Sequence, residues 1–368
     1  MGGHWPTIIS HFSLLREAIT SLSIFSRKRR LKYILLGSHG LGLTSMKYYL
    51  ERLGAKPAEV FCYEFIRPFY FSQDFEGMVL DKFPKSKMSA YVLASIRKKV
   101  PCYQIVRDPV SVMKSCLNAT ALHRLSIIQT QTDMEKLLEE LLMNIPHLMF
   151  YFASIRDLVK NQISEFSYLS QEDITKKLPQ TLNQICDRLK YLKQDIGGGE
   201  SVLKGTPFYR CFPHFFEISQ QTFVLYPKGR EGKIKEIDMG TYLENKPKIF
   251  FQKEIFEIST LKVDGYEDSL LYLAALDKAG LNLPKEQIIF EAEKYLQRIS
   301  LLLKKHQSLL WDEEKIIRYL TQNNPTLGQK IASKIRDELR YIYQESPGLY
   351  ESFRYTHKLF HFFDKIQL

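Results

Sequence analysis

A glycine-rich turn between a short apolar run and a helical pattern constrains the fold of this chain more than any other feature. The apolar run covers residues 33–36, the turn covers Gly37–Thr44, and the helical pattern covers 45–53 and ends at Gly54. Glycines let backbone N–H groups converge on an anion, and the dipole of the following helix favours negative charge there. The order therefore predicts a phosphate-binding loop in an α/β domain, while a turn that binds nothing is the alternative.

The turn matches the phosphate-loop pattern of kinases and nucleotide hydrolases in part. Gly37, Gly42 and Thr44 fit this pattern, but Leu43 occupies the position at which the pattern requires a Lys. That Lys contacts the transferred phosphoryl group, so its absence argues against kinase or ATPase chemistry. The residues expected to cradle phosphate are Gly37, Ser38, His39, Gly40, Gly42, Leu43, Thr44 and Ser45.

A second candidate phosphate contact follows another apolar run, at residues 103–106. Arg107 comes directly after this run, Pro109 can open a helix, and Ser115 comes eight positions after Arg107. A guanidinium is a planar fork of donors that suits phosphate, and a Ser on the following helix adds a hydroxyl. We expect Arg107 and Ser115 to clamp one phosphate.

The turn and the Arg–Ser pair together resemble those of the sulfotransferases that use 3′-phosphoadenylyl sulfate. In that family, a turn without the kinase Lys holds the 5′-phosphosulfate of the donor, and an Arg and a Ser at this spacing hold its 3′-phosphate. The segment Asp81-Lys82-Phe83-Pro84 is similar to an Asp-Lys-x-Pro segment of many bacterial members. The resemblance covers about residues 31–120. It implies a sulfotransferase-like P-loop fold with a central parallel sheet flanked by helices, 3′,5′-adenosine bisphosphate as product, and no metal.

The chain departs from the family at the cation of the turn. Most members have Lys or Arg at the position of Gly40, where it stabilises the charge on the leaving oxygen. His39 is a candidate substitute when protonated, and Lys47 and Lys82 are other cations nearby. For His39 and Lys82 alike, an exposed side chain without a role is the alternative.

The resemblance also implies a base that takes the proton of the acceptor hydroxyl, which must lie within hydrogen-bond reach of it. Glu64, at the end of the second strand candidate (59–65), is the first candidate by its location. Asp81 and His123 are weaker candidates, and a solvent-facing charge is the alternative for Glu64.

Apolar runs that alternate with helical patterns predict parallel strands joined by right-handed crossovers. Four parts are expected: an N-terminal amphipathic helix with a basic linker (1–30), a nucleotide-binding core (31–215), a β-rich insertion (216–265) and a helical C-terminal region (266–368). Helical patterns cover 89–99, 132–152, 174–193, 270–279, 285–306, 312–321 and 327–343, and strand patterns cover 59–65, 79–80, 222–226, 233–237 and 248–258.

Charge and cysteine usage limit the compartment and the partners. The net charge of +11 attracts anions, and without a recognisable nucleic-acid module a nucleotide is the expected partner. The 5 scattered cysteines favour a reducing cytoplasm over a disulfide framework or a zinc site. In residues 1–30 the basic cluster follows the apolar part, the reverse of a signal peptide. This segment either packs on the domain or attaches peripherally to an anionic membrane at its inner face.

These features predict a cytoplasmic enzyme that transfers a sulfuryl group from 3′-phosphoadenylyl sulfate to a hydroxyl of a surface glycan or glycolipid. The chain is similar to an uncharacterised bacterial group associated with surface-glycan modification. Two alternatives stay open. The same fold could use another nucleotide donor, as in a glycosyltransferase, because fold does not fix function. The chain could also be a non-catalytic binding or scaffold protein.

Overall fold

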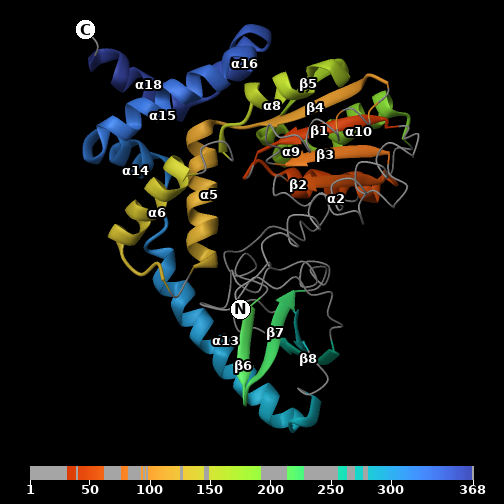
Figure 1. The fold of residues 1–368 in the computed structure, drawn as a ribbon, viewed down its shortest axis with the longest axis vertical. Coiled ribbons are helices and arrows are strands. Elements are labelled where there is room, and N and C mark those ends of the chain that lie inside the picture. The colour runs from red at the N-terminus through yellow and green to blue at the C-terminus, as the bar shows by residue number, and fades with distance from the viewer. Residues whose placement is uncertain are drawn as a thin grey trace, which may run out of the picture. The chain divides into compact units, whose positions relative to one another are not determined.

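A computed structural model describes residues 31–38, 40–61, 76–81, 93, 96, 98–124, 127–144, 149–191, 214–227, 256–262, 270–276 and 281–366 (Figure 1). The chain divides into two compact units. The first is made of residues 1–117, 135–199 and 311–368, and the second of residues 118–134 and 200–310.

The first unit is built on a five-stranded parallel sheet with the order β2-β3-β1-β4-β5. Its strands are β1 (Tyr33–Gly37), β2 (Pro57–Phe61), β3 (Gly77–Asp81), β4 (Val100–Val106) and β5 (Ile163–Ser170). Every residue of β1 is buried, as expected for a central parallel strand that is covered on both faces. The expected central parallel sheet is therefore present.

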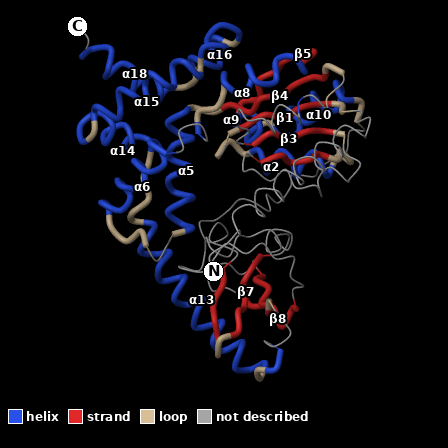
Figure 2. The backbone as a smooth tube through the Cα atoms, viewed as in Figure 1, coloured by secondary structure: helices blue, strands red, loops and turns tan. Residues whose placement is uncertain are grey.

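Some helices of the first unit lie against this sheet, while the C-terminal helices form a group to one side of it (Figures 1 and 2). The helices that precede the second unit's sheet in sequence are α2 (Leu43–Arg52), α5 (Pro109–His123), α6 (Gln131–Asn144), α8 (Ala153–Val159), the 3-10 turn η1 (Lys160–Gln162), α9 (Gln171–Lys176) and α10 (Leu178–Leu189). The end of α5 and the start of α6 belong to the second unit. The C-terminal ones are α14 (Glu313–Arg318), the π-helical turn η4 (Tyr319–Asn323), α15 (Pro325–Glu338), α16 (Arg340–Glu345), α17 (Pro347–Glu351) and α18 (Arg354–Ile366). Ile155 and Val159 of α8 pack against one face of β1, β3 and β4, and α2 contacts β2 and β3.

The strand order places a topological switch point between β1 and β4. These two strands are neighbours, yet the chain leaves β1 through α2 toward β2 on one side, and leaves β4 through α5 toward β5 on the other. The turns after the two strands therefore diverge at the carboxyl edge of the sheet. In open α/β sheets this crevice is where ligands bind.

The second unit holds an antiparallel sheet with the order β6-β7-β9-β8. Its strands are β6 (His214–Ile218), β7 (Gln221–Pro227), β8 (Phe256–Lys262) and β9 (Leu270–Ala275). The two residues between β6 and β7 both have positive φ, as a two-residue hairpin requires. Helix α13 (Lys285–Gln307) buries a helically spaced apolar stripe against this sheet: Ile288, Ala292, Leu296, Ile299 and Leu303.

Several sequence expectations need correction. The helix predicted over 270–279 is wrong over its first part, because 270–275 form β9, paired with β7 and β8 on its two sides. A short continuous apolar run does not distinguish a buried strand from a buried helix. The antiparallel sheet begins at His214 and includes β9, so it crosses both expected limits of the 216–265 insertion. Helix α13 belongs to the second unit and α14–α18 to the first.

Segment 163–170, which no sequence pattern indicated, forms the edge strand β5. Residues 1–30, the strand pattern at 233–237 and nearly all of the helical pattern at 89–99 lie outside the described residues.

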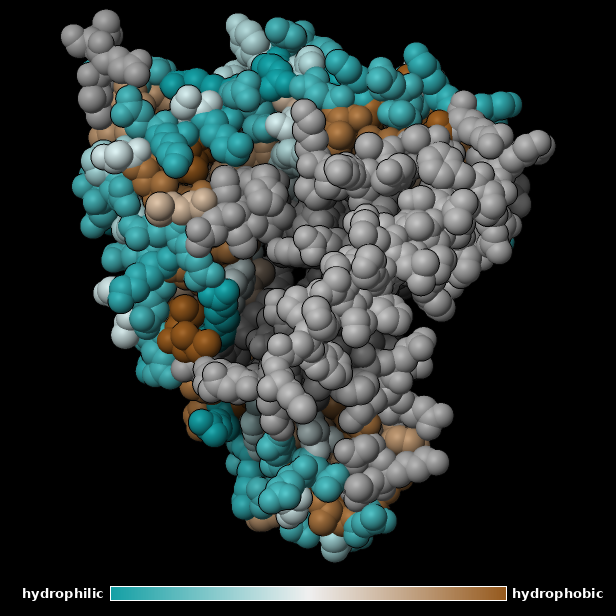
Figure 3. Space-filling view, viewed as in Figure 1, coloured by the Kyte–Doolittle hydropathy of each residue, from teal (hydrophilic) through white to brown (hydrophobic). Residues whose placement is uncertain are grey.

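None of the described helices is both long and apolar enough to cross a membrane. On the face drawn in Figure 3, the described surface is largely hydrophilic and is broken by small hydrophobic patches.

The pairing of β1 with β3 depends on a glycine. Tyr33 lies opposite Gly77, and a Cβ on Gly77 would stand 2.0 Å from Cζ of Tyr33. We predict that Gly77→Ala lowers the free energy of unfolding by about 1–3 kcal/mol through overpacking, and by clearly less in a Tyr33→Leu background. Urea denaturation of the four proteins checks this.

Gly348→Ala is the matched control, because no heavy atom lies within 4 Å of that Cβ position. It should change the free energy of unfolding by less than about 0.5 kcal/mol. An equal loss for Gly77→Ala in both backgrounds would contradict the proposed overlap with Tyr33.

Candidate functional site

The glycine-rich turn after β1 has the backbone conformation that its glycines allow. Gly40 and Gly42 have φ values of 83° and 87°, in the left-handed region that a side chain disfavours. Gly42 is also the N-cap residue of α2, and among the described residues no side chain caps this helix. The N-terminal N–H groups of a helix have no partner within it, so an uncapped N-terminus suits an anion.

Three side chains of the turn, those of Ser38, Leu41 and Leu43, are buried. The Ser38 hydroxyl is buried and donates to the carbonyl of Met149 at 3.1 Å. Leu43 is buried as well, and its Cδ1 lies 3.1 Å from where a Cβ on Gly37 would be. The position of the kinase Lys is therefore occupied by a core residue. Ser38 and Leu43 can contribute backbone groups to a ligand site.

Arg107 connects the turn to the start of α5. Its Nη1 donates to the Ser115 hydroxyl at 2.7 Å and to the Gly40 carbonyl at 3.3 Å. Both Arg107 and Ser115 are half-buried. The two candidate phosphate contacts, far apart in the sequence, thus meet at the carboxyl edge of neighbouring strands β1 and β4.

Gly40 lies close against α5, which accounts for the missing cation. A Cβ at this position would stand 3.3 Å from Sγ of Cys116 and 3.4 Å from Cβ of Ser115. The positive φ adds strain for any side chain. A Lys or Arg in place of Gly40 would combine this strain with a close contact to α5. The cation that the described structure places at the turn is Arg107.

The remaining predicted site residues are placed in part. His39, Glu64 and Lys82 lie outside the described residues. The backbone of Thr44 and Ser45 forms the first turn of α2, while their side chains are outside the description.

The weaker candidates are also placed in part. Asp81 ends β3 opposite Gly37, so its backbone is at the same edge of the sheet as the turn. His123 is at the far end of α5 from Arg107, and Lys47 pairs with Glu51 at 4.0 Å.

A buried carboxylate that no sequence pattern indicates anchors α5. Glu313 of α14 accepts a hydrogen bond from the Ser111 hydroxyl at 2.8 Å and forms an ion pair with Lys114 at 2.7 Å. Burial by itself would raise the pKa of Glu313, but the hydrogen bonds from Lys114 and Ser111 outweigh it and hold the pKa below its usual value. Ser111 and Glu313 are 202 positions apart in the sequence, so no local pattern indicates this contact.

Comparison with models of known protein families, with characterised proteins and with solved structures finds no match to this chain. Its class is therefore described by its own geometry. It is an α/β protein in which a glycine-rich turn, an Arg and a Ser meet at the switch point of a parallel sheet.

The two left-handed glycines of the site differ in how closely other atoms approach them. Gly40→Ala and Gly42→Ala impose the same backbone strain, about 1–2 kcal/mol, but a Cβ on Gly42 would meet no atom within 4 Å. We expect Gly40→Ala to lower the free energy of unfolding more than Gly42→Ala, measured by denaturant titration. Equal losses would mean that the turn does not pack on α5 as described.

The lowered pKa of Glu313 makes the stability of the protein depend on pH. A carboxylate whose pKa is lowered on folding stabilises the protein above its unfolded pKa, and this contribution disappears as the pH falls through the folded pKa. Glu313→Gln should therefore reduce the free energy of unfolding at pH 7 by about 1–3 kcal/mol, and the difference from wild type should shrink in acid. Thermal unfolding across pH measures both.

Glu314→Gln is the neighbouring control. Glu314 is half-exposed and paired with Lys358 at the surface, where an ion pair contributes about 0–1 kcal/mol. A Glu313→Gln difference that stays constant from neutral to acid pH would contradict the lowered pKa.

Proposed function

We propose that this protein binds a nucleotide with phosphates on both its 3′ and 5′ positions, and acts as a sulfotransferase-like enzyme. The observation that carries the proposal is the double contact of Arg107, whose Nη1 reaches both the Gly40 carbonyl and the Ser115 hydroxyl. The same residues form the resemblance to sulfotransferases that use 3′-phosphoadenylyl sulfate. The switch point between β1 and β4 supports a ligand site at this edge.

Each part of the site has a role in this proposal. Backbone N–H groups of the turn and of the N-terminus of α2 would hold the 5′-phosphosulfate of the donor substrate. Arg107 and Ser115 would hold the 3′-phosphate, the guanidinium supplying charge-assisted hydrogen bonds. The net charge of +11 favours the approach of such an anion.

The proposed reaction is an in-line transfer. The oxygen of an acceptor hydroxyl attacks sulfur, the bond from sulfur to the bridging phosphate oxygen breaks, and 3′,5′-adenosine bisphosphate leaves with that oxygen. A base takes the hydroxyl proton, for which Glu64 is our first candidate. His39 and Lys82 are candidates for stabilising the leaving oxygen. The acceptor we propose is a surface glycan or glycolipid.

The second candidate function is group transfer from a different nucleotide donor, and the packing of Gly40 favours it. A side chain at Gly40 would pack tightly against α5 and would need a positive φ, so the position disfavours the cation that most sulfotransferases carry there. The same site could then serve a different nucleotide, such as the sugar nucleotide of a glycosyltransferase.

Calorimetry with 3′,5′-adenosine bisphosphate tests the donor site. We expect measurable binding by wild type, about 10- to 100-fold weaker binding by Arg107→Ala because charged hydrogen bonds are lost, and about 5-fold weaker binding by Ser115→Ala. The control is Arg188→Ala, since Arg188 also donates to a Ser hydroxyl, that of Ser167 at 2.6 Å on β5. Its binding should equal wild type.

No binding by wild type, or unchanged binding by Arg107→Ala, would disprove this donor site. A thermal-shift comparison of the bisphosphate with sugar nucleotides separates the two enzyme functions, since only a ligand that binds the folded state raises the melting temperature. Binding of the bisphosphate without turnover on any glycan would favour a non-catalytic role.

A further inference from the structure

Asp108, the residue after Arg107, caps two helices with one carboxylate. Its Oδ1 accepts from the backbone N–H of Val110 at 2.9 Å, at the start of α5. The same carboxylate receives the N-terminus of α18: Oδ2 accepts from the N–H groups of Tyr355 (2.9 Å) and Thr356 (3.3 Å), and Oδ1 accepts from the Thr356 hydroxyl at 2.8 Å. Thr356 is fully buried, so its hydroxyl hydrogen-bonds to Asp108 in place of water.

A shared cap fixes the position of one helix against the other. The first N–H groups of a helix need outside acceptors, and a carboxylate satisfies them with favourable charge. Because one rigid carboxyl group serves both α5 and α18, neither helix end can move without loss of a hydrogen bond. Asp108 follows Arg107 in the chain, so the same contact limits the position of the Arg107 backbone, from which the guanidinium side chain extends.

The next turns of α5 are held by the same C-terminal region. Ser111 and Lys114 both contact Glu313 of α14, and α14 contacts α18. Residues 108, 111 and 114 are three apart, so they follow one side of the helix. Ser115 comes immediately after Lys114. The helix segment between the two candidate phosphate contacts is thus fastened along its length to α14 and α18.

We propose that Asp108 is a positioning residue, which the N-terminus of α18 holds in place so that Arg107 and Ser115 are aligned for the 3′-phosphate of the nucleotide. This inference rests on the proposed function. It makes the C-terminal helices, which share no feature with the sulfotransferase resemblance, part of the nucleotide site.

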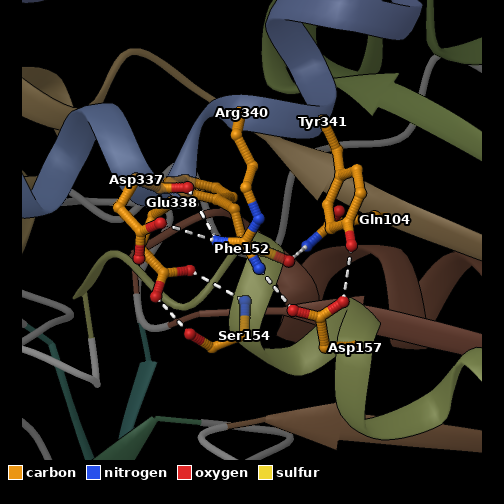
Figure 4. A network of polar contacts seen from close by, with 8 residues as sticks. All are labelled: Gln104, Phe152, Ser154, Asp157, Asp337, Glu338, Arg340 and Tyr341. Carbon is orange, nitrogen blue, oxygen red and sulfur yellow. Dashed lines mark hydrogen bonds and ion pairs between the residues drawn. The ribbon is translucent and has the colours of Figure 1, made fainter.

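A second carboxylate offers a comparison within the same unit. Asp157 of α8 accepts from the Tyr341 hydroxyl at 2.6 Å and from the Arg340 guanidinium, and so fastens α16 to the core (Figure 4). Asp157 and its partners belong neither to the turn after β1 nor to the turn after β4. Loss of this anchor should weaken the fold without moving Arg107.

The experiment uses conservative variants of Thr356 in the full chain. Thr356→Val removes the hydroxyl that donates to Asp108 and keeps the side-chain shape, while Thr356→Ser keeps the hydroxyl. We expect Thr356→Val to bind 3′,5′-adenosine bisphosphate about 5-fold more weakly than wild type, as for one lost hydrogen bond, and Thr356→Ser to bind as wild type does. Asp157→Asn should lower the melting temperature and leave the affinity unchanged.

A wild-type affinity for Thr356→Val, or an equal loss of affinity in Asp157→Asn, would overturn the positioning role. If wild type itself does not bind the bisphosphate, the proposed donor site fails, and amide hydrogen exchange over residues 107–118 decides the positioning role separately. Faster exchange there in Thr356→Val than in Thr356→Ser would support it, and identical exchange would overturn it.

Discussion

The contact on which the candidate site depends is the double hydrogen bond of Arg107. It joins the turn after β1 to the helix after β4, two segments that the parallel sheet brings to the same edge. The turn supplies a carbonyl because Gly40 adopts a left-handed conformation and lies against α5. The helix supplies a hydroxyl because Ser115 is two turns from the N-terminus of α5. A guanidinium that is already oriented by two acceptors loses less freedom when an anion binds.

The sheet itself explains why these parts meet. In a parallel sheet all carboxyl ends share one edge. The chain continues from β1 toward one side of the sheet and from β4 toward the other, which separates the turns that follow these strands. Gly77 keeps β1 and β3 close by leaving room for the Tyr33 ring. The position of the site is thus a consequence of strand order, which residues well outside the site determine.

Local patterns were sufficient for the parts of the site that lie within about ten residues of one another. The sequence predicted the strands β1 and β4 and the glycine turn, because each of them depends on a short stretch of neighbouring residues. It also placed Arg107 and Ser115 on either side of the start of one helix. The anchoring contacts could not. Ser38 with Met149 and Ser111 with Glu313 are 111 and 202 residues apart, and each uses a residue type that is common on surfaces.

The strand β9 shows a different limit. Its sequence is a continuous apolar run whose periodicity fits a helix as well as a strand, and its pairing with β7 and β8 decides the outcome. The edge strand β5 has an irregular mixture of exposed and buried residues, so its sequence does not show the alternation that would predict a strand paired with β4. In both segments tertiary contacts outweigh local preference.

The link between Asp108 and Thr356 spans 248 residues, which has a consequence for the order in which the protein is made. Synthesis proceeds from the N-terminus, and long-range contacts form after the chain has closed a large loop. The parallel sheet is complete in sequence by Ser170, but α18 is the last described helix. A nascent chain can therefore contain every strand of the sheet while α5 still lacks its cap from α18. The framework around Arg107 is finished only after α18 has left the ribosome.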